Sequence, residues 1–270
     1  RLGLKIHLQI HSDASDFIVQ LKGLNPCGKY DEWLQKINSW KSQYPVINEP
    51  HETGDLIDPY LFLSKLSYLI PKDSILLSDT GSVLAWLMQS FEPSGQQRIF
   101  HDFNNTAMGW ALPAAIGVKL AASGRTCICL VGDGSLMMNI QELQTAITYK
   151  LNIKIICFDN SGYSMIQQTQ DQWLDGYYLA SSNSGGVVMP DLSSVAAAFG
   201  YQVRTVYKTE EAVASIKWLV EEESPCFLLL KIDQRCRVSP QVKFGKPNED
   251  PEPLLDRSVF KNEMIIDPVS

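Results

Sequence analysis

The sequence predicts an α/β protein with three layers, in which helices cover both faces of a mainly parallel sheet. Two observations support this class. From about residue 58 onward, short strand patterns alternate with amphipathic helix patterns, an order typical of parallel sheets. The strand segments are also nearly continuous apolar runs, such as Ile-Lys-Ile-Ile-Cys-Phe at 153–158, and such runs are expected of strands buried on both faces.

Composition and charge narrow the class of protein further. The chain has 270 residues, of which 45% are hydrophobic and 20% charged, a balance typical of globular proteins rather than of disordered, collagen-like or coiled-coil chains. A chain of this length buries a core without a disulfide or metal. Its formal net charge of −7 disfavours nucleic acid or an anionic membrane as a partner.

The cysteines and the apolar runs indicate the compartment. Four of the six cysteines lie in apolar strand segments, where Cys behaves as a small hydrophobic residue: Cys127, Cys129, Cys157 and Cys226. No CxxC motif or other zinc spacing is present. We therefore expect a reducing, cytoplasmic location. The longest strong apolar run, 226–230, is too short to cross a membrane, and we expect no signal peptide.

The chain divides into four expected segments. Residues 1–25 are expected to form a strand at 3–10 and a helix at 14–24 that Asp13 caps, and we interpret this piece as the end of a domain whose remainder lies upstream of Arg1. Residues 26–57 are expected to be a linker with a helix at 31–44. Residues 58–235 form the main domain, and residues 236–270 form a tail that wraps over the surface.

The main domain is expected to alternate regularly between helices and strands. The strands are expected at 74–78, 98–102, 126–131, 153–159, 201–206 and 226–232. The helices are expected at 59–69, 82–89, 108–122, 140–151, 192–199 and 210–222. Asn139 is expected to cap the helix at 140–151, with Glu142 at the capping-box spacing.

Small polar turns that contain glycine follow three of these strands, at 79–82, 132–135 and 159–163. Ligands of parallel sheets bind beyond the carboxyl ends of the strands, so we expect the three turns to meet there. Gly132 and Gly134 allow backbone N–H groups to approach a phosphate. Asp133 between them would repel that phosphate unless a cation such as Mg²⁺ joined the two, and Asn160 can supply a further oxygen ligand.

Each of these two motifs is ambiguous when it is taken alone. Gly-Asp-Gly also forms ordinary turns, and Asp or Asn commonly ends a strand. Together they are more specific, because they follow two buried strands about two dozen residues apart, with one helix between them. The pair therefore favours a joint metal and phosphate site.

The same residues resemble a known family. Gly132-Asp133-Gly134 followed by Asp159-Asn160 resembles the metal-binding signature of thiamine-diphosphate-dependent enzymes, and 108–117, Met-Gly-Trp-Ala-Leu-Pro-Ala-Ala-Ile-Gly, resembles a segment of acetolactate synthase (acetohydroxyacid synthase large subunit). The resemblance covers essentially the whole chain as the C-terminal part of a longer enzyme. It implies the thiamine diphosphate-binding fold, with residues 60–235 as the diphosphate-binding domain and residues 1–25 as the end of the family's central domain.

The resemblance also implies roles for individual residues. Mg²⁺ would be held by Asp133, Asn160 and the carbonyl of Gly162. Contacts to thiamine diphosphate would come from Thr80, Gly81, Ser82, Thr106, Met108, Gly134, Ser135, Tyr163 and Ile166. Among these, Met108 would be the apolar wedge under the thiamine, and its N–H would bind the aminopyrimidine together with the carbonyl of Thr106. Tyr163, Ile166 and Gln167 would also border the substrate. The alternatives are core packing for Met108 and a helix start for 163–167.

The implied activity is decarboxylation of a 2-keto acid and transfer of the acyl unit to a second carbonyl compound. In this family a Glu on a separate domain, normally from the partner subunit, activates the cofactor. We find no such residue here, because Glu142 and Glu210 are better interpreted as a cap or as solvent-facing residues. The isolated chain is therefore expected to be inactive, and the enzyme a homo-oligomer, a dimer or tetramer. FAD occurs in some relatives, but this chain does not support it.

Two departures from the family leave other functions open. Asp159 stands where Asn is common, and Thr169 stands where the biosynthetic synthases place a Trp that selects the acceptor. The alternatives are a related 2-keto acid decarboxylase, a carboligase with another acceptor, or a non-catalytic binding module. A dinucleotide-binding protein lacks support because no GxGxxG follows a strand. For His101 we favour a strand-end hydrogen bond over acid–base chemistry.

Overall fold

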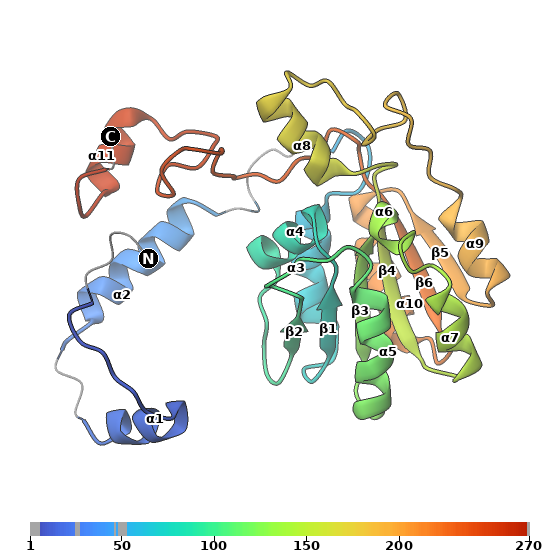
Figure 1. Ribbon diagram of the computed structural model, residues 1–270, viewed down its shortest axis with the longest axis horizontal. Helices are drawn as coiled ribbons and strands as arrows, with labels where there is room; N and C mark the ends of the chain where they lie inside the picture. Colours follow the sequence, from blue (N-terminus) through green and yellow to red (C-terminus); the bar gives the residue numbers. More distant parts are fainter. Residues whose placement is uncertain (1–5, 25–27, 46, 48–52, 269–270) are drawn as a thin grey trace. The chain divides into compact units, whose positions relative to one another are not determined.

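The computed structural model describes residues 6–24, 28–45, 47 and 53–268 of the chain (Figure 1). It divides into two units, residues 1–45 and residues 46–270. Each unit is described by itself below.

The described residues of the first unit form two helices, α1 (Ala14–Lys22) and α2 (Asp31–Gln43). Asp13 caps α1 as predicted, because its side chain accepts the N–H of Ser15. The predicted strand at 3–10 is wrong for residues 6–10, which form no strand and leave Ile6 73% and Leu8 77% exposed. A strand needs a hydrogen-bonded neighbour, and the described residues of this unit contain no other strand. Residues 3–5 lie outside the described residues.

The second unit is built on a six-stranded parallel sheet with the order β2-β1-β3-β4-β6-β5. The strands are β1 (Ile75–Ser78), β2 (Arg98–Phe100), β3 (Cys127–Gly132), β4 (Ile153–Asp159), β5 (Gln202–Val206) and β6 (Cys226–Lys231). All six expected strands are present. Their apolar composition agrees with the structure, since nearly every residue of β1, β3, β4 and β6 is buried.

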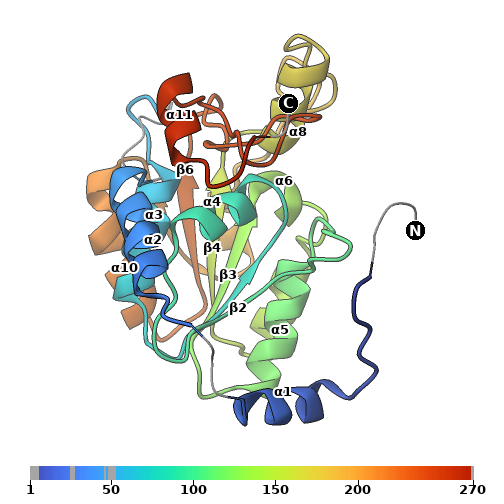
Figure 2. The ribbon, with the colours of Figure 1, turned by 90° about the vertical axis from the view of Figure 1, so that its left-hand side faces the viewer.

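Helices cover both faces of this sheet and give the three predicted layers (Figure 2). One face carries α3 (Pro59–Leu69), α4 (Ser82–Ser90) and α10 (Ala212–Glu221), which follows the short 3₁₀ helix η2 (Thr209–Glu211). The other face carries α5 (Ala111–Ala121), α7 (Glu142–Thr148) and α9 (Leu192–Ala198). The remaining helices of the unit are α6 (Asp133–Leu136), α8 (Ser164–Trp173) and α11 (Arg257–Glu263).

The two faces of the sheet have separate hydrophobic cores. On β3, Ile128 and Leu130 pack with α3, α4 and α10, whereas Cys129 and Val131 pack with α5, α7 and α9. All four are fully buried, as the alternation of side chains along a strand requires when both faces are covered. Burial of such side chains stabilises the fold by roughly 1.5–3 kcal/mol each.

The helices predicted to start at 108 and 140 begin later in the structure. The helix expected from Met108 begins at Ala111, because Gly109 adopts a φ of +82°, which no helix tolerates. The helix expected at 140–151 is limited to α7, and Asn139 does not cap it. Instead, the side-chain Nδ2 of Asn139 donates to the carbonyl of Gly109 at 2.8 Å, so the predicted capping box is wrong.

The start of the tail belongs to the core rather than to a surface wrap. Cys236 is fully buried and Val238 is 6% exposed, and both pack with the cluster that includes α3 and α4. Gln168 of α8 holds this segment, because its side chain bonds both the N–H and the carbonyl of Val238. For these two residues the expectation of a tail outside the core is therefore wrong.

The topology predicts a ligand-binding site at the edge of the sheet where the strand order reverses. From β1 the chain adds β2 on one side of the sheet and then adds β3 on the other side. The turns after β1, β3 and β4 therefore lie beside one another at the carboxyl ends of the strands, where parallel sheets bind ligands. Helices α6 and α8 lie at this end of the sheet (Figure 1).

Candidate cofactor and metal site

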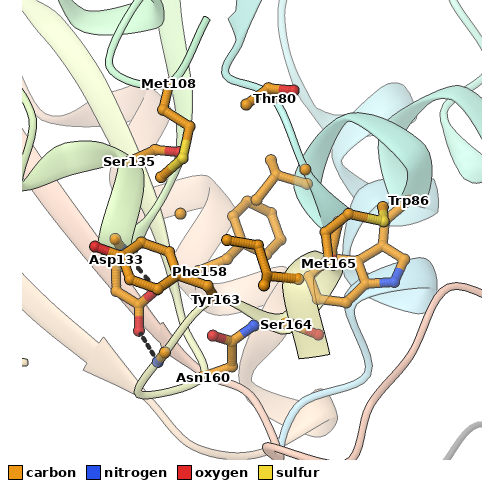
Figure 3. Close-up of a pocket in the computed structure, with 17 residues that line it drawn as sticks. Thr80, Trp86, Met108, Asp133, Ser135, Phe158, Asn160, Tyr163, Ser164 and Met165 are labelled. Atoms are coloured by element: carbon orange, nitrogen blue, oxygen red, sulfur yellow. Dashed lines mark hydrogen bonds between the residues drawn. The ribbon is translucent and has the colours of Figure 1, made fainter. Parts of the chain in front are cut away.

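A pocket opens at the carboxyl ends of β1, β3 and β4 (Figure 3). Its lining includes 80–82 after β1, 132–135 at the end of β3, and Asn160, Gly162 and Tyr163 after β4. The predicted meeting of the three turns is therefore confirmed. Of the residues predicted to bind cofactor or metal, all line this pocket except Thr106.

Asp133 joins two of the turns. Its side chain is 2% exposed, and its two carboxylate oxygens accept the N–H of Gly134 at 2.7 Å and the N–H of Gly162 at 3.0 Å (Figure 3). Burial, and then the negative charge of Asp159, raises the pKa of the Asp133 carboxyl. A buried carboxylate in such surroundings requires a positive charge to stay ionised, and a divalent cation would supply it.

Two buried side-chain oxygens of residues that line the pocket with Asp133 have no hydrogen-bond partner among the described residues. They are Oδ1 of Asn160 and Oγ of Ser82, in residues that are 7% and 6% exposed. A buried unsatisfied polar atom costs about 1–3 kcal/mol, so a ligand that bonded these two oxygens would recover this cost. A carboxylate, an amide oxygen, a hydroxyl and a backbone carbonyl form the hard oxygen set that Mg²⁺ shares with phosphate oxygens. The residues present therefore fit a magnesium ion and a diphosphate.

Two glycines of the turns, Gly134 and Gly162, leave no room for a side chain. A Cβ on Gly134 would lie 2.1 Å from the ring of Tyr163, and a Cβ on Gly162 would lie 2.5 Å from the carbonyl oxygen of Ser181. Both distances are far below any real contact. The backbone of the Gly-Asp-Gly turn therefore packs directly against Tyr163, and the backbone of the turn after β4 packs directly against Ser181. These contacts fix the shape of both turns.

Met108 reaches the pocket from the loop between β2 and α5. It lines the pocket next to Ser135 (Figure 3). Thr106 of the same loop is exposed, with a φ of +51°, and does not line the pocket. Its predicted contact used only its carbonyl, so that role stays a prediction.

Gln167 is placed differently from the two residues predicted beside it. Tyr163 and Ile166 line the pocket, but Gln167 does not, and its buried amide donates to the carbonyl of Ser181 at 2.7 Å. Helix α8 begins at Ser164. For Gln167 the structure therefore favours the helix-start alternative over a place beside the substrate.

Sequence reasoning missed several lining residues, mostly apolar ones. They are Val83, Trp86, Phe158, Ser164 and Met165. Trp86 follows Ser82 by one helical turn, and this spacing could have placed both on the same face of α4. Trp86 and Phe158 also belong to the core, with ring centroids 6.1 Å apart, so their apolar character alone did not distinguish lining from packing.

Two side chains near the site are engaged in structural contacts. Nδ1 of His101 lies 2.8 Å from the carbonyl oxygen of Ser78, which confirms the predicted strand-end hydrogen bond. Asp159, which departs from the common Asn, forms an ion pair with Lys231 of β6 and also accepts the N–H of Ser161 at 3.0 Å. Neither His101 nor Asp159 lines the pocket.

The fold and the site together define an α/β domain whose pocket, at the carboxyl ends of parallel strands, fits a diphosphate and a metal ion. A family model described as "Thiamine pyrophosphate enzyme, C-terminal TPP binding domain" matches residues 79–229. The chain belongs to this family of thiamine pyrophosphate enzymes. Across the part of the chain that the structure describes, no helix is both long and apolar enough to span a bilayer.

Curated relatives agree with the predicted branch. The large subunit of acetolactate synthase isozyme 1 from Escherichia coli K12 is 27% identical over 90% of this chain, and the large subunit from Porphyra purpurea is 31% identical over 88%. The matches cover 42% and 40% of those relatives, so the chain spans about two fifths of their length.

A solved structure shows the same fold. The thiamine diphosphate-dependent 4-hydroxybenzoylformate decarboxylase of Rhodococcus jostii RHA1 superposes with a TM-score of 0.61 at 23% identity. The match covers 69% of this chain and 34% of that one.

Proposed function

We propose that this chain is the cofactor-binding part of an acetolactate synthase-like enzyme, which decarboxylates a 2-keto acid and transfers the acyl unit to a second carbonyl compound. The relatives named as acetolactate synthases support this reaction. The observation that carries the proposal is the pairing of buried Asp133 with the unpartnered oxygen of Asn160 in one pocket.

In this proposal each side of the pocket holds one part of the cofactor. Asp133, Asn160 and the carbonyl of Gly162 hold Mg²⁺. The diphosphate lies against 80–82 and 134–135, where α4 begins at Ser82 and presents its first N–H groups. Met108, with the carbonyl of Thr106, supports the thiamine end, and Tyr163 and Ile166 border it. Bound thiamine diphosphate supplies the electron sink that decarboxylation of a 2-keto acid requires.

The acid that activates the cofactor is proposed to lie outside this chain. Among the described residues that line the pocket, Asp133 is the only acidic one, and its two oxygens already accept backbone N–H groups. A homo-oligomer in which a partner subunit supplies the activating Glu would complete the site. The 270-residue chain alone should then bind cofactor without turning over pyruvate, and turnover by this polypeptide would contradict the proposal.

Calorimetry with thiamine diphosphate and Mg²⁺ tests the cofactor site. We expect wild type to bind, and we expect Asp133→Ala and Asn160→Ala to weaken binding at least tenfold. Asp256→Ala is the matched control, because it removes a carboxylate that caps α11 and does not line the pocket. Equal binding by wild type and Asp133→Ala would overturn the metal assignment.

The identity of the acceptor is tested by product analysis. The assay uses the full-length enzyme, which includes the domain that carries the activating Glu. With this enzyme, pyruvate should give acetolactate. Acetaldehyde would instead indicate a related decarboxylase, an alternative that the absence of Trp at Thr169 keeps open. Cofactor binding without any product would indicate a non-catalytic module. We also propose a cytoplasmic location, which the buried thiols of Cys127, Cys129, Cys157 and Cys226, none of them in a disulfide, support.

A further inference from the structure

Gly109, the neighbour of Met108, is held at both of its backbone polar groups by side chains from other turns. Its N–H donates to Oδ1 of Asp79 at 3.1 Å, and its carbonyl accepts from Nδ2 of Asn139 at 2.8 Å. Asp79 follows β1, and Asn139 precedes α7. The wedge loop, defined here as residues 101–110, is therefore fixed from two sides just beside the pocket.

Asp79 is fully buried and accepts three backbone N–H groups. They belong to Thr80 at 3.0 Å, Gly109 at 3.1 Å and Ala111 at 3.0 Å. Hydrogen bonds to an ionised carboxylate are about twice as strong as those between neutral groups. Asp79 therefore joins the end of β1, the wedge loop and the first residue of α5 into one unit.

Gly109 has no room for a side chain. Its φ is +82°, and an added Cβ would lie 2.7 Å from Cβ of Met138 and 2.9 Å from Nδ2 of Asn139. The wedge loop thus packs directly against the residues between α6 and α7. The placement of Met108 depends on this contact because Met108 is the adjacent residue.

We propose that Asp79 and Asn139 are positioning residues that clamp Gly109 and thereby fix where Met108 presents its side chain and its N–H to the thiamine end of the cofactor. This inference rests on the proposed function. Neither residue lines the pocket, so both act through the wedge loop. The diphosphate end is held by other residues, and the clamp should therefore affect one end of the cofactor more than the other.

The test compares two probes with the 270-residue chain, each in the presence of Mg²⁺: thiamine diphosphate, and inorganic pyrophosphate, which lacks the thiamine end. Wild type should bind thiamine diphosphate more tightly than pyrophosphate. Asn139→Ala should raise the Kd for thiamine diphosphate about tenfold, the order expected for a lost hydrogen bond. Asp79→Asn keeps one acceptor oxygen for these N–H groups and should raise the Kd by a smaller factor. Their Kd for pyrophosphate should stay within about twofold of wild type.

Matched controls separate positioning from general destabilisation. Asp58→Asn alters a buried carboxylate that caps α3 through Tyr60 and Leu61 N–H groups, and Gln144→Ala removes an exposed amide from α7. Neither lines the pocket, and both should leave the Kd values for both probes unchanged. If Asp79→Asn fails to fold, the test rests on Asn139→Ala, which changes a half-buried side chain.

Each remaining outcome has a distinct meaning. If wild type binds neither probe, the proposed function fails. If wild type binds both probes equally, the diphosphate site stands but Met108 does not contact the ligand, and the clamp proposal is overturned. If Asn139→Ala weakens both probes by the same factor, its role is structural only, and the proposal is again overturned.

Discussion

Asp159 and Lys231 stand opposite each other on the neighbouring strands β4 and β6 and form an ion pair. Asp159 is 5% exposed and lies close enough to Asp133 to contribute to its raised pKa. The protein therefore places two carboxylates side by side in its interior, and Lys231 compensates one of them. This arrangement leaves Asp133 as the carboxylate available to a metal ion.

Removal of Lys231 should destabilise the fold. Lys231→Met leaves the Asp159 carboxylate buried without its partner. Such a change lowers the free energy of unfolding by about 3–5 kcal/mol when the pair is fully buried. Because the Lys231 side chain is 32% exposed, we expect a loss of about 2 kcal/mol here. Urea unfolding at pH 7 measures the change. Asp159→Asn in the same chain should recover part of the loss. Lys217→Met, on the exposed face of α10, is the control, and an equal effect of both lysine variants would contradict this account.

Two Gly→Ala substitutions should have opposite effects on stability. Gly162→Ala forces a methyl group against the Ser181 carbonyl and should cost about 1–3 kcal/mol. Gly117→Ala lies within α5 with no atom within 4 Å of the new Cβ, so it should add about 0.5–1 kcal/mol. Thermal unfolding of the two variants provides the comparison. A neutral Gly162→Ala would show that the turn after β4 is not tightly packed.

The cap of α9 should lose its effect in acid. Hydrogen bonds from the side chains of Ser193 and Ser194 lower the pKa of Asp191 to about 2. The pKa of an unfolded Asp is about 3.9, so the ionised cap stabilises the fold above about pH 4 and loses this effect as the pH falls toward 2. The stability difference between wild type and Asp191→Asn, followed by denaturant unfolding, should be constant from pH 7 to 5 and shrink below pH 4. A difference that grows in acid would refute the assignment.

The buried thiols should be unreactive in the native state. Burial raises the pKa of Cys127 to about 12 and that of Cys226 to about 11, and it also raises those of Cys129 and Cys157. In a Cys27→Ser variant, a thiol reagent at pH 8 should therefore label the native protein far more slowly than the urea-unfolded protein. Rapid labelling without urea would show that a strand edge opens on the time scale of the reaction.

Much of the fold was predictable because its signals are local. Strand β4 agrees with the prediction to the residue, since a run such as 153–159 carries its own evidence of burial. The meeting of the three turns also followed from parallel topology alone. The predicted strand at 3–10 was wrong over residues 6–10, since alternation indicates a strand only where a partner strand is available.

The parts of the site that were not predictable depend on distant partners. The capping-box spacing of Asn139 and Glu142 is a local pattern, but Asn139 bonds Gly109, 30 residues away, and the tertiary contact prevailed. The departure at Asp159 lacked an explanation in the sequence because its partner Lys231 is 72 residues away. Trp86 satisfied every criterion of a core residue and also lines the pocket.

The all-parallel pairing of the sheet has a consequence for how the chain folds. No two neighbouring strands can be joined by a tight hairpin, so each pairing requires the closure of a long loop before it gains any stability. For example, the pairing of Asp159 with Lys231 closes a loop of 72 residues. Such non-local pairing slows folding, and the apolar strands stay accessible to other chains meanwhile. Recovery of native protein after dilution from denaturant should therefore fall as the protein concentration rises.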